Sequence, residues 1–431
     1  MKLIYVVIDG MGDLPIKELG DRTPLDFAET PHMDFLASKG KLGLMRTVGK
    51  QIAPESDVAV ISILGYDPYR YHVGRGPLEA YGSGLEMENG NLALRCNFAA
   101  LGQGRTIIDR RAGRDLTTRE TMELADAVNK QVKLESHPAE FEFKSTLGHR
   151  GVLVIRSKRK RSLSGGVTNT DPAYERVAGL GVAKTAVELV LNDCHPLKDT
   201  EAARLSASLV NEFTRKSHEV LDQHKVNLRR AAEGRMKANV ILTRDAGDRL
   251  PRFFSISEHY GVKFACLADM PVERGISRLA GMHLVELPPP SGNTKADCKL
   301  RASRLLAILR DFDCFYIHLK GPDEPGHDGE CERKAQSIAD IDRYFLGDLL
   351  PRIVLEETLM CITADHSTPC QLKAHSDDPV PLLISGCRTK PDGIRSFSEK
   401  TCAKGSLGML EKGTQLMPML MRFLKESKDP F

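Results

Sequence analysis

Residues 361–379 read Cys-Ile-Thr-Ala-Asp365-His366-Ser-Thr-Pro-Cys-Gln-Leu-Lys-Ala-His375-Ser-Asp-Asp-Pro, and they indicate the fold class. The short apolar run 359–364 is typical of a strand buried on both faces of a parallel sheet. It ends abruptly in Asp365-His366, and His375 follows. Ligands gather at the carboxyl ends of strands in open α/β sheets. A carboxylate and two imidazoles there suit a divalent metal of the zinc or manganese type, although a helix cap and a loop histidine leave the same pattern.

The N-terminus repeats this arrangement. Residues 3–8 are apolar and β-branched, so they predict a second central strand, and Asp9-Gly10 follows at once. Glycines at positions 10 and 12 permit a sharp turn. An acid at a strand end is typical of a ligand site, although a plain strand-to-helix turn is equally compatible with these residues.

A third strand is predicted at residues 312–319, and it leads to Asp323 and His327. Their spacing matches one face of a helix. Pro325 and Gly326 lie between them and disfavour a helix, so we expect a loop that turns both side chains towards one point. A bound metal gives a physical reason for holding such a loop.

The apolar segment 58–65 predicts a helix that places Ser56 near its N-terminus. Unpaired N–H groups and the helix dipole favour an anion such as phosphate at that end. The alternative is that Ser56 serves only as a helix cap.

These segments together supply three carboxylates, three imidazoles and one hydroxyl. Such a set is large enough for two metal ions, which can clamp both oxygens of an in-line phosphoryl displacement and activate a serine hydroxyl. We expect four separate strand ends to provide the ligands, namely Asp9, then Asp323 with His327, then Asp365 with His366, then His375.

Composition sets broad limits on the 431-residue chain. There are 61 basic and 58 acidic residues, giving a net charge of +3, which disfavours a protein built mainly to bind nucleic acid. The ten cysteines form no C-x-x-C pair, and no signal peptide or membrane span is evident. We therefore expect a cytoplasmic protein with reduced thiols and no membrane partner. An oligomer is compatible with the sequence.

The rest of the chain predicts further elements. Segments 89–99 and 141–156 are strand-like, and we expect helices over 199–236 and 406–425. The basic run 156–161 allows a nucleic-acid interpretation. It lacks neighbouring aromatic residues and lies beside a Ser-Gly-Gly turn, so a solvated turn is preferred.

A collinear series of motifs spans nearly the whole chain. Besides the acidic and histidine segments above, it comprises Asp9-Gly-Met-Gly-Asp13, Gly65-Tyr-Asp-Pro68, Gly74-Arg-Gly-Pro-Leu-Glu-Ala80, Arg95-Cys-Asn-Phe98, Asp109-Arg-Arg-Ala-Gly-Arg114, Thr170-Asp-Pro172 and Leu279-Ala-Gly-Met282. In these motifs the chain resembles the archaeal-type cofactor-independent (2,3-bisphosphoglycerate-independent) phosphoglycerate mutases of the alkaline phosphatase superfamily. The resemblance implies an α/β fold, an alkaline-phosphatase-like core with a central, mostly parallel sheet flanked by helices and interrupted by a smaller α/β insert. We place the metal-binding core at residues 1–75 and 251–431, and the substrate-binding insert at residues 76–250.

The resemblance also implies the chemistry and its residues. Ser56 matches the family nucleophile, which takes the phosphoryl group from 3-phosphoglycerate and returns it to the 2-hydroxyl, a step of glycolysis and gluconeogenesis. Two divalent ions, usually manganese with zinc, cobalt or magnesium as alternatives, assist it, and 2,3-bisphosphoglycerate is not needed. By position, Asp9, Ser56, Asp365 and His366 would bind one ion, and Asp323, His327 and His375 the other. The implied substrate-binding residues are Arg111, Arg114, His149, Arg150, Arg244 and Arg274.

Three positions depart from the family pattern and leave the rate and the substrate open. Glu55 and Asp245 stand where the family favours glycine, and Val60 replaces a common asparagine. A metal-dependent phosphatase or another phosphomutase on the same core is therefore the main alternative. A non-enzymatic nucleic-acid or anion binder using the run 156–161 is the remaining one.

Overall fold

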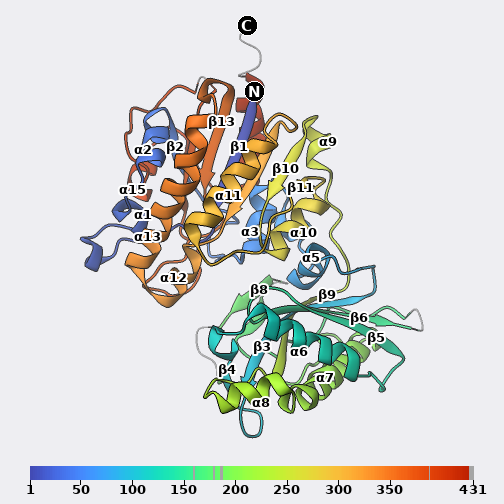
Figure 1. Ribbon diagram of the computed structural model, residues 1–431. Coiled ribbons are helices and arrows are strands. Elements are labelled where there is room, and N and C mark those ends of the chain that lie inside the picture. The colour runs from blue at the N-terminus through green and yellow to red at the C-terminus, as the bar shows by residue number, and fades with distance from the viewer. Residues whose placement is uncertain (159–160, 178–179, 185–187, 388, 427–431) are drawn as a thin grey trace. The chain divides into compact units, whose positions relative to one another are not determined.

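The computed structural model describes residues 1–158, 161–177, 180–184, 188–387 and 389–426 (Figure 1). The chain divides into two compact units. Unit 1 comprises Met1–Tyr71 and Arg252–Phe431, and unit 2 comprises His72–Pro251. The sequence-based boundaries after residues 75 and 250 differ from these by a few positions, and the roles assigned to the two parts stay predictions.

Unit 1 is built on one eight-stranded sheet. Its neighbouring strands, in order, are β11 (His283–Leu284), β10 (Phe264–Leu267), β12 (Cys314–Leu319), β1 (Lys2–Ile8), β13 (Thr358–Thr363), β14 (Val380–Ser385), β2 (Gly40–Met45) and β15 (Gly408–Leu410). Of these eight, β14 alone runs against the others. Every residue of β12 and β13 is buried, as expected for strands covered on both faces. The predicted α/β class and mostly parallel sheet are confirmed.

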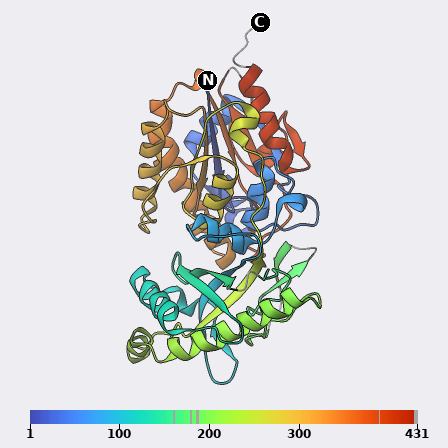
Figure 2. The ribbon, with the colours of Figure 1, turned by 90° about the vertical axis from the view of Figure 1, so that its right-hand side faces the viewer.

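Helices cover both faces of this sheet. Figure 2 shows α11 (Thr294–Ala307) and α13 (Cys331–Ile341) on one face, and α3 (Ser56–Ile63) and α16 (Leu416–Glu426) on the other. The remaining α-helices of unit 1 are α1 (Pro24–Phe27), α2 (Pro31–Ser38), α4 (Pro68–Tyr71), α9 (Ile256–Tyr260), α10 (Pro271–Leu279), α12 (Asp323–Asp328), α14 (Gly347–Leu349) and α15 (Glu399–Cys402).

Unit 2 contains an antiparallel sheet whose centre is β3 (Leu92–Leu101). Its other strands are β4 (Ile107–Asp109), β5 (Ala139–Ser145), β6 (Arg150–Ser157) and β9 (Val240–Gly247), and β7 (Tyr174–Val177) pairs separately with β8 (Leu180–Ala183). The helices of this unit are α5 (Arg75–Gly82), α6 (Thr118–Gln131), α7 (Glu201–Asp222) and α8 (Lys225–Ala232).

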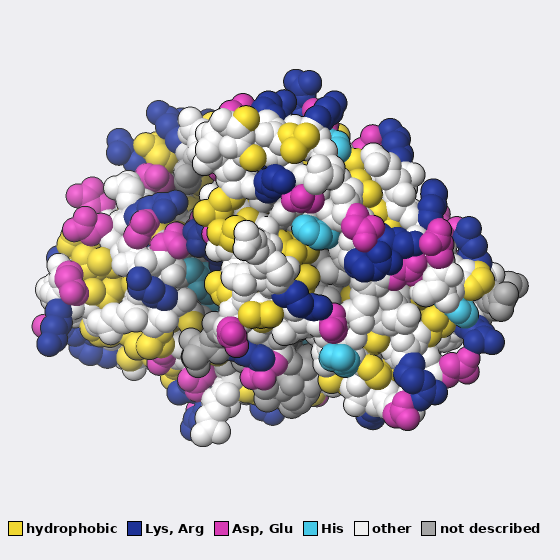
Figure 3. All heavy atoms as spheres, turned by 90° about the horizontal axis from the view of Figure 1, so that it is seen from below, with side chains coloured by type: hydrophobic (Ala, Val, Ile, Leu, Met, Phe, Trp, Pro, Cys, Tyr) yellow, Lys and Arg dark blue, Asp and Glu magenta, His cyan; other side chains and the backbone are white. Residues whose placement is uncertain are grey.

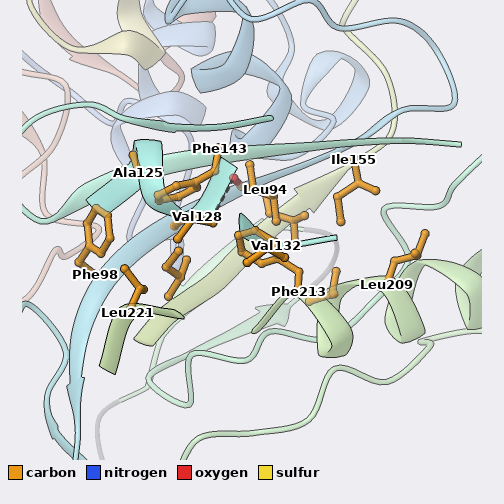
Figure 4. Packing of buried hydrophobic residues seen from close by; sticks show 14 of the residues in the cluster. Leu94, Phe98, Ala125, Val128, Val132, Phe143, Ile155, Leu209, Phe213 and Leu221 are labelled. Atoms are coloured by element: carbon orange, nitrogen blue, oxygen red, sulfur yellow. Dashed lines mark hydrogen bonds between the residues drawn. The ribbon is translucent and has the colours of Figure 1, made fainter. Parts of the chain in front are cut away.

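Alternation along β3 separates two environments. Leu94 and Phe98 point into a hydrophobic core with residues from α6 and α7, where the rings of Phe98 and Phe143 pack edge to face with their centroids 5.4 Å apart (Figure 4). Fully burying a phenylalanine side chain stabilises a fold by roughly 1.5–3 kcal/mol. Because successive strand residues point to opposite faces, Arg95 lies on the other face, which α5 contacts.

Two predicted helices differ from the structure. The segment 199–236 forms α7 and α8 rather than one helix, because His224 starts the second helix by accepting the N–H of Val226 on its side chain. The segment 406–425 begins with β15, which pairs in parallel with β2, and only then enters α16. Gly408 has a φ of 65°, a left-handed conformation that a continuous helix does not allow.

In the described part of the chain, no helix combines the length and the apolar character needed to span a membrane.

The described members of the basic run each lie beside a carboxylate. Arg156 is 3.5 Å from Glu142, and Arg161 pairs with Glu201. Residues 159 and 160 lie outside the described residues. On the face that Figure 3 shows, basic and acidic side chains are interspersed rather than gathered by sign. These pairs support the interpretation as a solvated turn, and the expected lack of nucleic-acid binding stays a prediction.

Candidate functional site

Three adjacent strand ends of unit 1 converge at one edge of the sheet. Strand β1 pairs in parallel with β12 on one side and β13 on the other, so the carboxyl ends of all three meet. Asp9 follows β1 directly, Asp323 follows β12, and Asp365 follows β13. The parallel pairing therefore gathers three carboxylates that are far apart in sequence.

His375 does not lie at a fourth strand end, which corrects the sequence prediction. It lies on the connection between β13 and β14, the same connection that carries Asp365 and His366. Ser367 forms isolated bridges with both Met11 and Ser376, so this connection folds back across the turn after β1. Folding back brings His375 to the same edge of the sheet.

The segment carrying Asp323 and His327 is a helix, α12, so the predicted loop is wrong. Asp323 is its first residue, which puts Pro325 in the first turn. The N–H groups of a first turn have no partner within a helix, so the missing N–H of proline costs little there. The pair therefore shares one helix face, with His327 Nε2 3.5 Å from Asp323 Oδ1.

Ser56 is the first residue of α3, as the sequence predicts. Its Oγ lies 3.4 Å from His366 Nε2. The same nitrogen lies 3.4 Å from Asp9 Oδ1 and 3.4 Å from Asp365 Oδ2. The structure thus brings Ser56 and the first predicted ligand group together around His366.

The partners of the three imidazoles place their protons on Nδ1. His327 Nδ1 lies 3.1 Å from the Lys373 carbonyl, and His375 Nδ1 lies 2.8 Å from the Pro54 carbonyl, and a carbonyl can only accept. His366 Nδ1 lies 3.0 Å from the Thr368 hydroxyl.

The Thr368 hydroxyl donates its own proton to Asp323 Oδ1 at 2.8 Å, so it accepts the Nδ1–H of His366. Each Nε2 consequently presents a lone pair, the form in which histidine binds metals. The lone pairs of His327 and His375 face each other at 3.1 Å, an arrangement that a cation between them would stabilise.

The carboxylates fit a cation as well. Asp9 Oδ1 and Asp365 Oδ2 are buried and have no hydrogen-bond partner among the described residues. Burial raises the pKa of Asp365, and the charge of Asp9 raises it further. Burial also opposes ionisation of Asp9, but Lys320, His366 and His318 together outweigh burial and hold the pKa of Asp9 well below its usual value. A buried carboxylate oxygen that accepts no hydrogen bond is costly unless a cation compensates it.

Side chains of this kind form three groups close enough to hold a metal ion. They are Asp323, His327 and His375; Asp9, Asp323 and His366; and Asp9, His318 and Asp365. The first group is the second predicted ligand set. The other two groups share Asp9. One joins it to His366 and Asp323, and the other joins it to Asp365 and His318.

Sequence reasoning missed three residues of this centre. Lys320 Nζ lies 3.0 Å from Asp9 Oδ2 and 2.8 Å from Glu273 Oε1. His318 Nε2 lies 3.6 Å from Asp365 Oδ2, and burial, with the charge of Lys320, lowers the pKa of His318 to about 4. An imidazole within the otherwise hydrophobic residues 314–319 was the available signal for His318.

Unit 2 holds a separate basic cluster on the α5 face of its sheet. Arg95 on β3 and Arg244 on β9 are direct cross-strand partners, and both are buried. Like charges in that position repel. Burial, with Arg244 and Arg75, lowers the pKa of Arg95 to about 10, although Glu79 lies 3.3 Å from its Nε. A bound anion would relieve this repulsion.

His149, Arg150 and Arg111 belong to the same cluster. Burial and the charges of Arg150, Arg111, Arg95 and Arg244 lower the pKa of His149 to about 2. Burial likewise lowers the pKa of Arg111, and the charge of Arg114 lowers it further. Five predicted substrate-binding residues therefore gather in unit 2.

Arg110, Tyr174 and Asp171 support this cluster. Arg110 donates two hydrogen bonds to Asp171, at 2.8 and 2.6 Å. The Arg244 guanidinium lies over the Tyr174 ring, 3.7 Å from its centroid. Sequence reasoning missed Arg75, Arg95 and Arg110. Arg95 had a signal, because it alternates with the apolar residues of 92–98.

Arg274 belongs to unit 1, whereas the other five predicted substrate-binding residues belong to unit 2. It belongs to α10 of unit 1, and its Nη2 lies 3.3 Å from Glu286 Oε2.

Of the three departures from the family pattern, Asp245 fits its local backbone conformation. Asp245 has a φ of 54°, a left-handed conformation that glycine adopts freely and aspartate tolerates better than most residues. Glu55 precedes α3. Burial and His366 oppose protonation of His375, but Asp323 and Glu55 outweigh them and raise its pKa. Val60 is buried within α3.

Comparisons with known proteins agree with the geometry. A sequence model of the 2,3-bisphosphoglycerate-independent phosphoglycerate mutase family matches residues 37–227. The chain is 43% identical to the 2,3-bisphosphoglycerate-independent phosphoglycerate mutase of Aeropyrum pernix, over 98% of this chain and 100% of that protein. It is 40% identical to the enzyme of the same name from Methanopyrus kandleri, over 97% and 95% of the two chains.

Solved structures show the same similarity. The cofactor-independent phosphoglycerate mutase of Thermoplasma acidophilum matches with a TM-score of 0.62 and 30% identity, over 98% of this chain and 100% of that one. The PH0037 protein of Pyrococcus horikoshii matches with a TM-score of 0.76 and 31% identity, over 99% and 98% of the two chains. The resemblance predicted from the motifs is confirmed, and the chain belongs to the 2,3-bisphosphoglycerate-independent phosphoglycerate mutase family.

Proposed function

We propose that this chain is an isomerase that interconverts 3-phosphoglycerate and 2-phosphoglycerate, with Ser56 as the nucleophile. The observation that carries the proposal is the position of Ser56 Oγ, 3.4 Å from His366 Nε2, beside Asp9 and Asp365. The similarity to mutases over nearly the full length supports the substrate.

Two divalent ions are part of the proposal. Asp9, Ser56, Asp365 and His366 would hold one, and Asp323, His327 and His375 the other. The mixture of carboxylates and imidazoles suits manganese, cobalt or zinc better than an all-oxygen magnesium site. When bound, such ions lower the pKa of a coordinated hydroxyl and neutralise charge on a phosphoryl group.

Ser56 would perform the transfer in two steps. In the first, the Ser56 hydroxyl loses its proton and Oγ forms a bond to phosphorus, while the bond from phosphorus to the 3-oxygen breaks and that oxygen takes up a proton to leave glycerate. In the second, the 2-hydroxyl loses its proton and attacks the phosphoserine, the bond from phosphorus to Oγ breaks, and Oγ takes up a proton to restore the serine. The first turn of α3 favours the phosphate through its unpaired N–H groups.

Unit 2 would recognise the substrate. Arg111, Arg114, His149, Arg150 and Arg244 supply donors for a phosphate or carboxylate, and arginine binds such groups with two parallel bonds. Arg274 would add a contact from unit 1. Holding glycerate while the phosphoserine persists excludes hydrolysis, which separates a mutase from a phosphatase.

The product ratio tests this proposal. The protein is incubated with 3-phosphoglycerate and Mn²⁺, and 2-phosphoglycerate is measured against free phosphate. We expect 2-phosphoglycerate as the main product without added 2,3-bisphosphoglycerate. Free phosphate without the isomer would instead identify a phosphatase on the same core.

Metal removal tests the second part of the proposal. A chelator should abolish the isomerisation, and added Mn²⁺ should restore it. Activity that is indifferent to the chelator would exclude metal-assisted attack by Ser56.

A further inference from the structure

Lys334 lies in α13 and is fully buried, with an exposed fraction of 0%. Its ammonium donates three hydrogen bonds: to the Gly12 carbonyl at 2.9 Å, to Asp13 Oδ2 at 2.8 Å and to the Thr368 carbonyl at 2.8 Å. An ammonium has three donors, so all are used. None of these three acceptors belongs to a proposed metal ligand.

The acceptors lie on the two turns that carry the ligands. Gly12 and Asp13 follow Asp9 in the turn after β1. Thr368 follows Asp365 and His366 after β13. A single side chain from α13 therefore joins the turn of Asp9 to the turn of Asp365.

Thr368 carries this connection on to the ligands themselves. Its N–H donates to the Gly12 carbonyl at 3.0 Å, the carbonyl that also accepts from Lys334. Its hydroxyl accepts from His366 Nδ1 at 3.0 Å and donates to Asp323 Oδ1 at 2.8 Å. Moving the Thr368 backbone would thus turn the His366 ring and shift Asp323.

Asp13 fixes the other end of the connection. Besides Lys334, its carboxylate accepts the N–H of Cys370, at 3.3 and 3.2 Å, and the N–H of Leu14 at 2.8 Å. A buried ammonium is tolerated only when it is paired and fully hydrogen-bonded, and the pairing with Asp13 and two carbonyls meets both conditions. The result is a rigid junction in the interior of unit 1.

We propose that Lys334 is a positioning residue for the metal centre: it fixes the distance between the Asp9 turn and the Asp365–Thr368 turn, and the affinity for divalent ions depends on it. The inference rests on the proposed metal centre. Substituting a residue that orients metal ligands without touching the metal typically lowers metal affinity by about 10- to 100-fold.

The test is the Mn²⁺ affinity of the full-length, metal-stripped protein, measured by calorimetry. Lys334→Met keeps the length of the side chain and removes its donors. We expect Mn²⁺ to bind about 10- to 100-fold more weakly to this variant. In the product assay, saturating Mn²⁺ should restore most of the rate, which a general loss of structure would not allow.

Two further variants separate positioning from folding. Lys334→Met leaves the Asp13 charge buried and unpaired, so the variant is at risk of unfolding. Lys334→Met combined with Asp13→Asn removes that charge and keeps an oxygen to accept from Cys370 and Leu14, yet it does not restore the junction. We expect the double variant to fold and still to bind Mn²⁺ weakly.

Arg333→Met is the matched control, since Arg333 precedes Lys334 on α13, is 58% exposed and pairs with Glu330. Its Mn²⁺ affinity should equal that of the wild type. A folded double variant with wild-type affinity would overturn the inference alone. A wild-type protein that binds no Mn²⁺ would overturn the proposed metal centre and the inference with it.

Discussion

The proposed metal centre of unit 1 and the basic cluster of unit 2 carry charges of opposite sign. In unit 1, buried acids and imidazole lone pairs converge, with Lys320 as a cation beside Asp9. In unit 2, guanidinium groups converge on one sheet face, with Glu79 and Asp171 as nearby acids. Each cluster carries an excess of one charge, and we expect a ligand of the opposite charge to stabilise each.

Sheet topology explains how each cluster is assembled. Parallel strands deliver their carboxyl ends to one edge, so unit 1 gathers its groups on turns. Antiparallel strands place residues side by side across the sheet, so in unit 2 the pair Arg95 and Arg244 comes from two neighbouring strands, β3 and β9.

The largest effect should come from removing the nucleophile of unit 1. We expect Ser56→Ala to lower the isomerisation rate by about a thousandfold or more, because no other group replaces its bond to phosphorus. The rate is measured by following 2-phosphoglycerate formation with Mn²⁺ present.

Ser62→Ala is the matched control for this change, since Ser62 is also buried on α3 and its Oγ accepts no hydrogen bond from the described residues. It should retain most of the activity. Full activity in Ser56→Ala would exclude this serine as the nucleophile. It would also contradict the assignment of the chemical step to unit 1.

The next effect concerns the turn that presents Arg111 and Arg114 in unit 2. Ala112, Gly113 and Arg114 all have positive φ, at 47°, 76° and 58°, a strained run that needs support. Arg230, fully buried, donates to the Ala112 carbonyl at 3.2 Å and pairs with Asp115. We expect Arg230→Met to lower the free energy of unfolding by about 3–5 kcal/mol, since it leaves buried partners without donors.

Arg235 offers a control for that prediction. It is more exposed than Arg230, yet it pairs with the same two acids, Asp115 and Glu120, and lies 3.0 Å from Glu120 Oε1. Arg235→Met should cost about 1 kcal/mol or less. Denaturant unfolding measures both values, and equal losses in the two variants would show that the buried arginine does not hold the turn.

The smallest expected effect is the protonation of one side chain in unit 2, His149. His149 has a pKa lowered to about 2 by burial and by the surrounding arginines. Because this folded pKa lies below the unfolded value of about 6.5, the unfolded chain takes up the proton first, and stability is lost as the pH falls below about 6.5. NMR should therefore show neutral His149 near pH 5 in the ligand-free protein.

A bound anion should raise that pKa by offsetting the arginine charges. Phosphate or 3-phosphoglycerate is added, and the His149 resonance is followed through an acid titration. An ordinary titration near pH 6.5 without ligand, or no change on adding the anion, would show that the cluster is not the anion-binding face of unit 2.

The sequence was sufficient to predict much of unit 1 because its signals are local. An apolar run that stops at an acid marks a buried strand and its functional end, as at Asp9 and Asp365. The helix α12 was missed for an equally local reason, since Pro325 was weighed as a helix interior residue and lies in the first turn.

The sequence was a weaker guide to residues whose surroundings come from distant segments. Lys320 lies beside Asp9 and Glu273 only after the sheet forms, and Lys334 joins two turns that are more than 300 positions apart in sequence. In unit 2, Arg95 on β3 meets Glu79 only because α5 packs on β3. Side-chain pairing of this kind depends on tertiary structure.

The most direct measurement is the anomalous scattering of manganese in crystals of the full-length protein grown with Mn²⁺. The account predicts two peaks, one among Asp9, Ser56, Asp365 and His366, and the other among Asp323, His327 and His375. A single peak elsewhere, or Ser56 Oγ outside coordination distance of both ions, would contradict the claim that this hydroxyl faces a pair of cations.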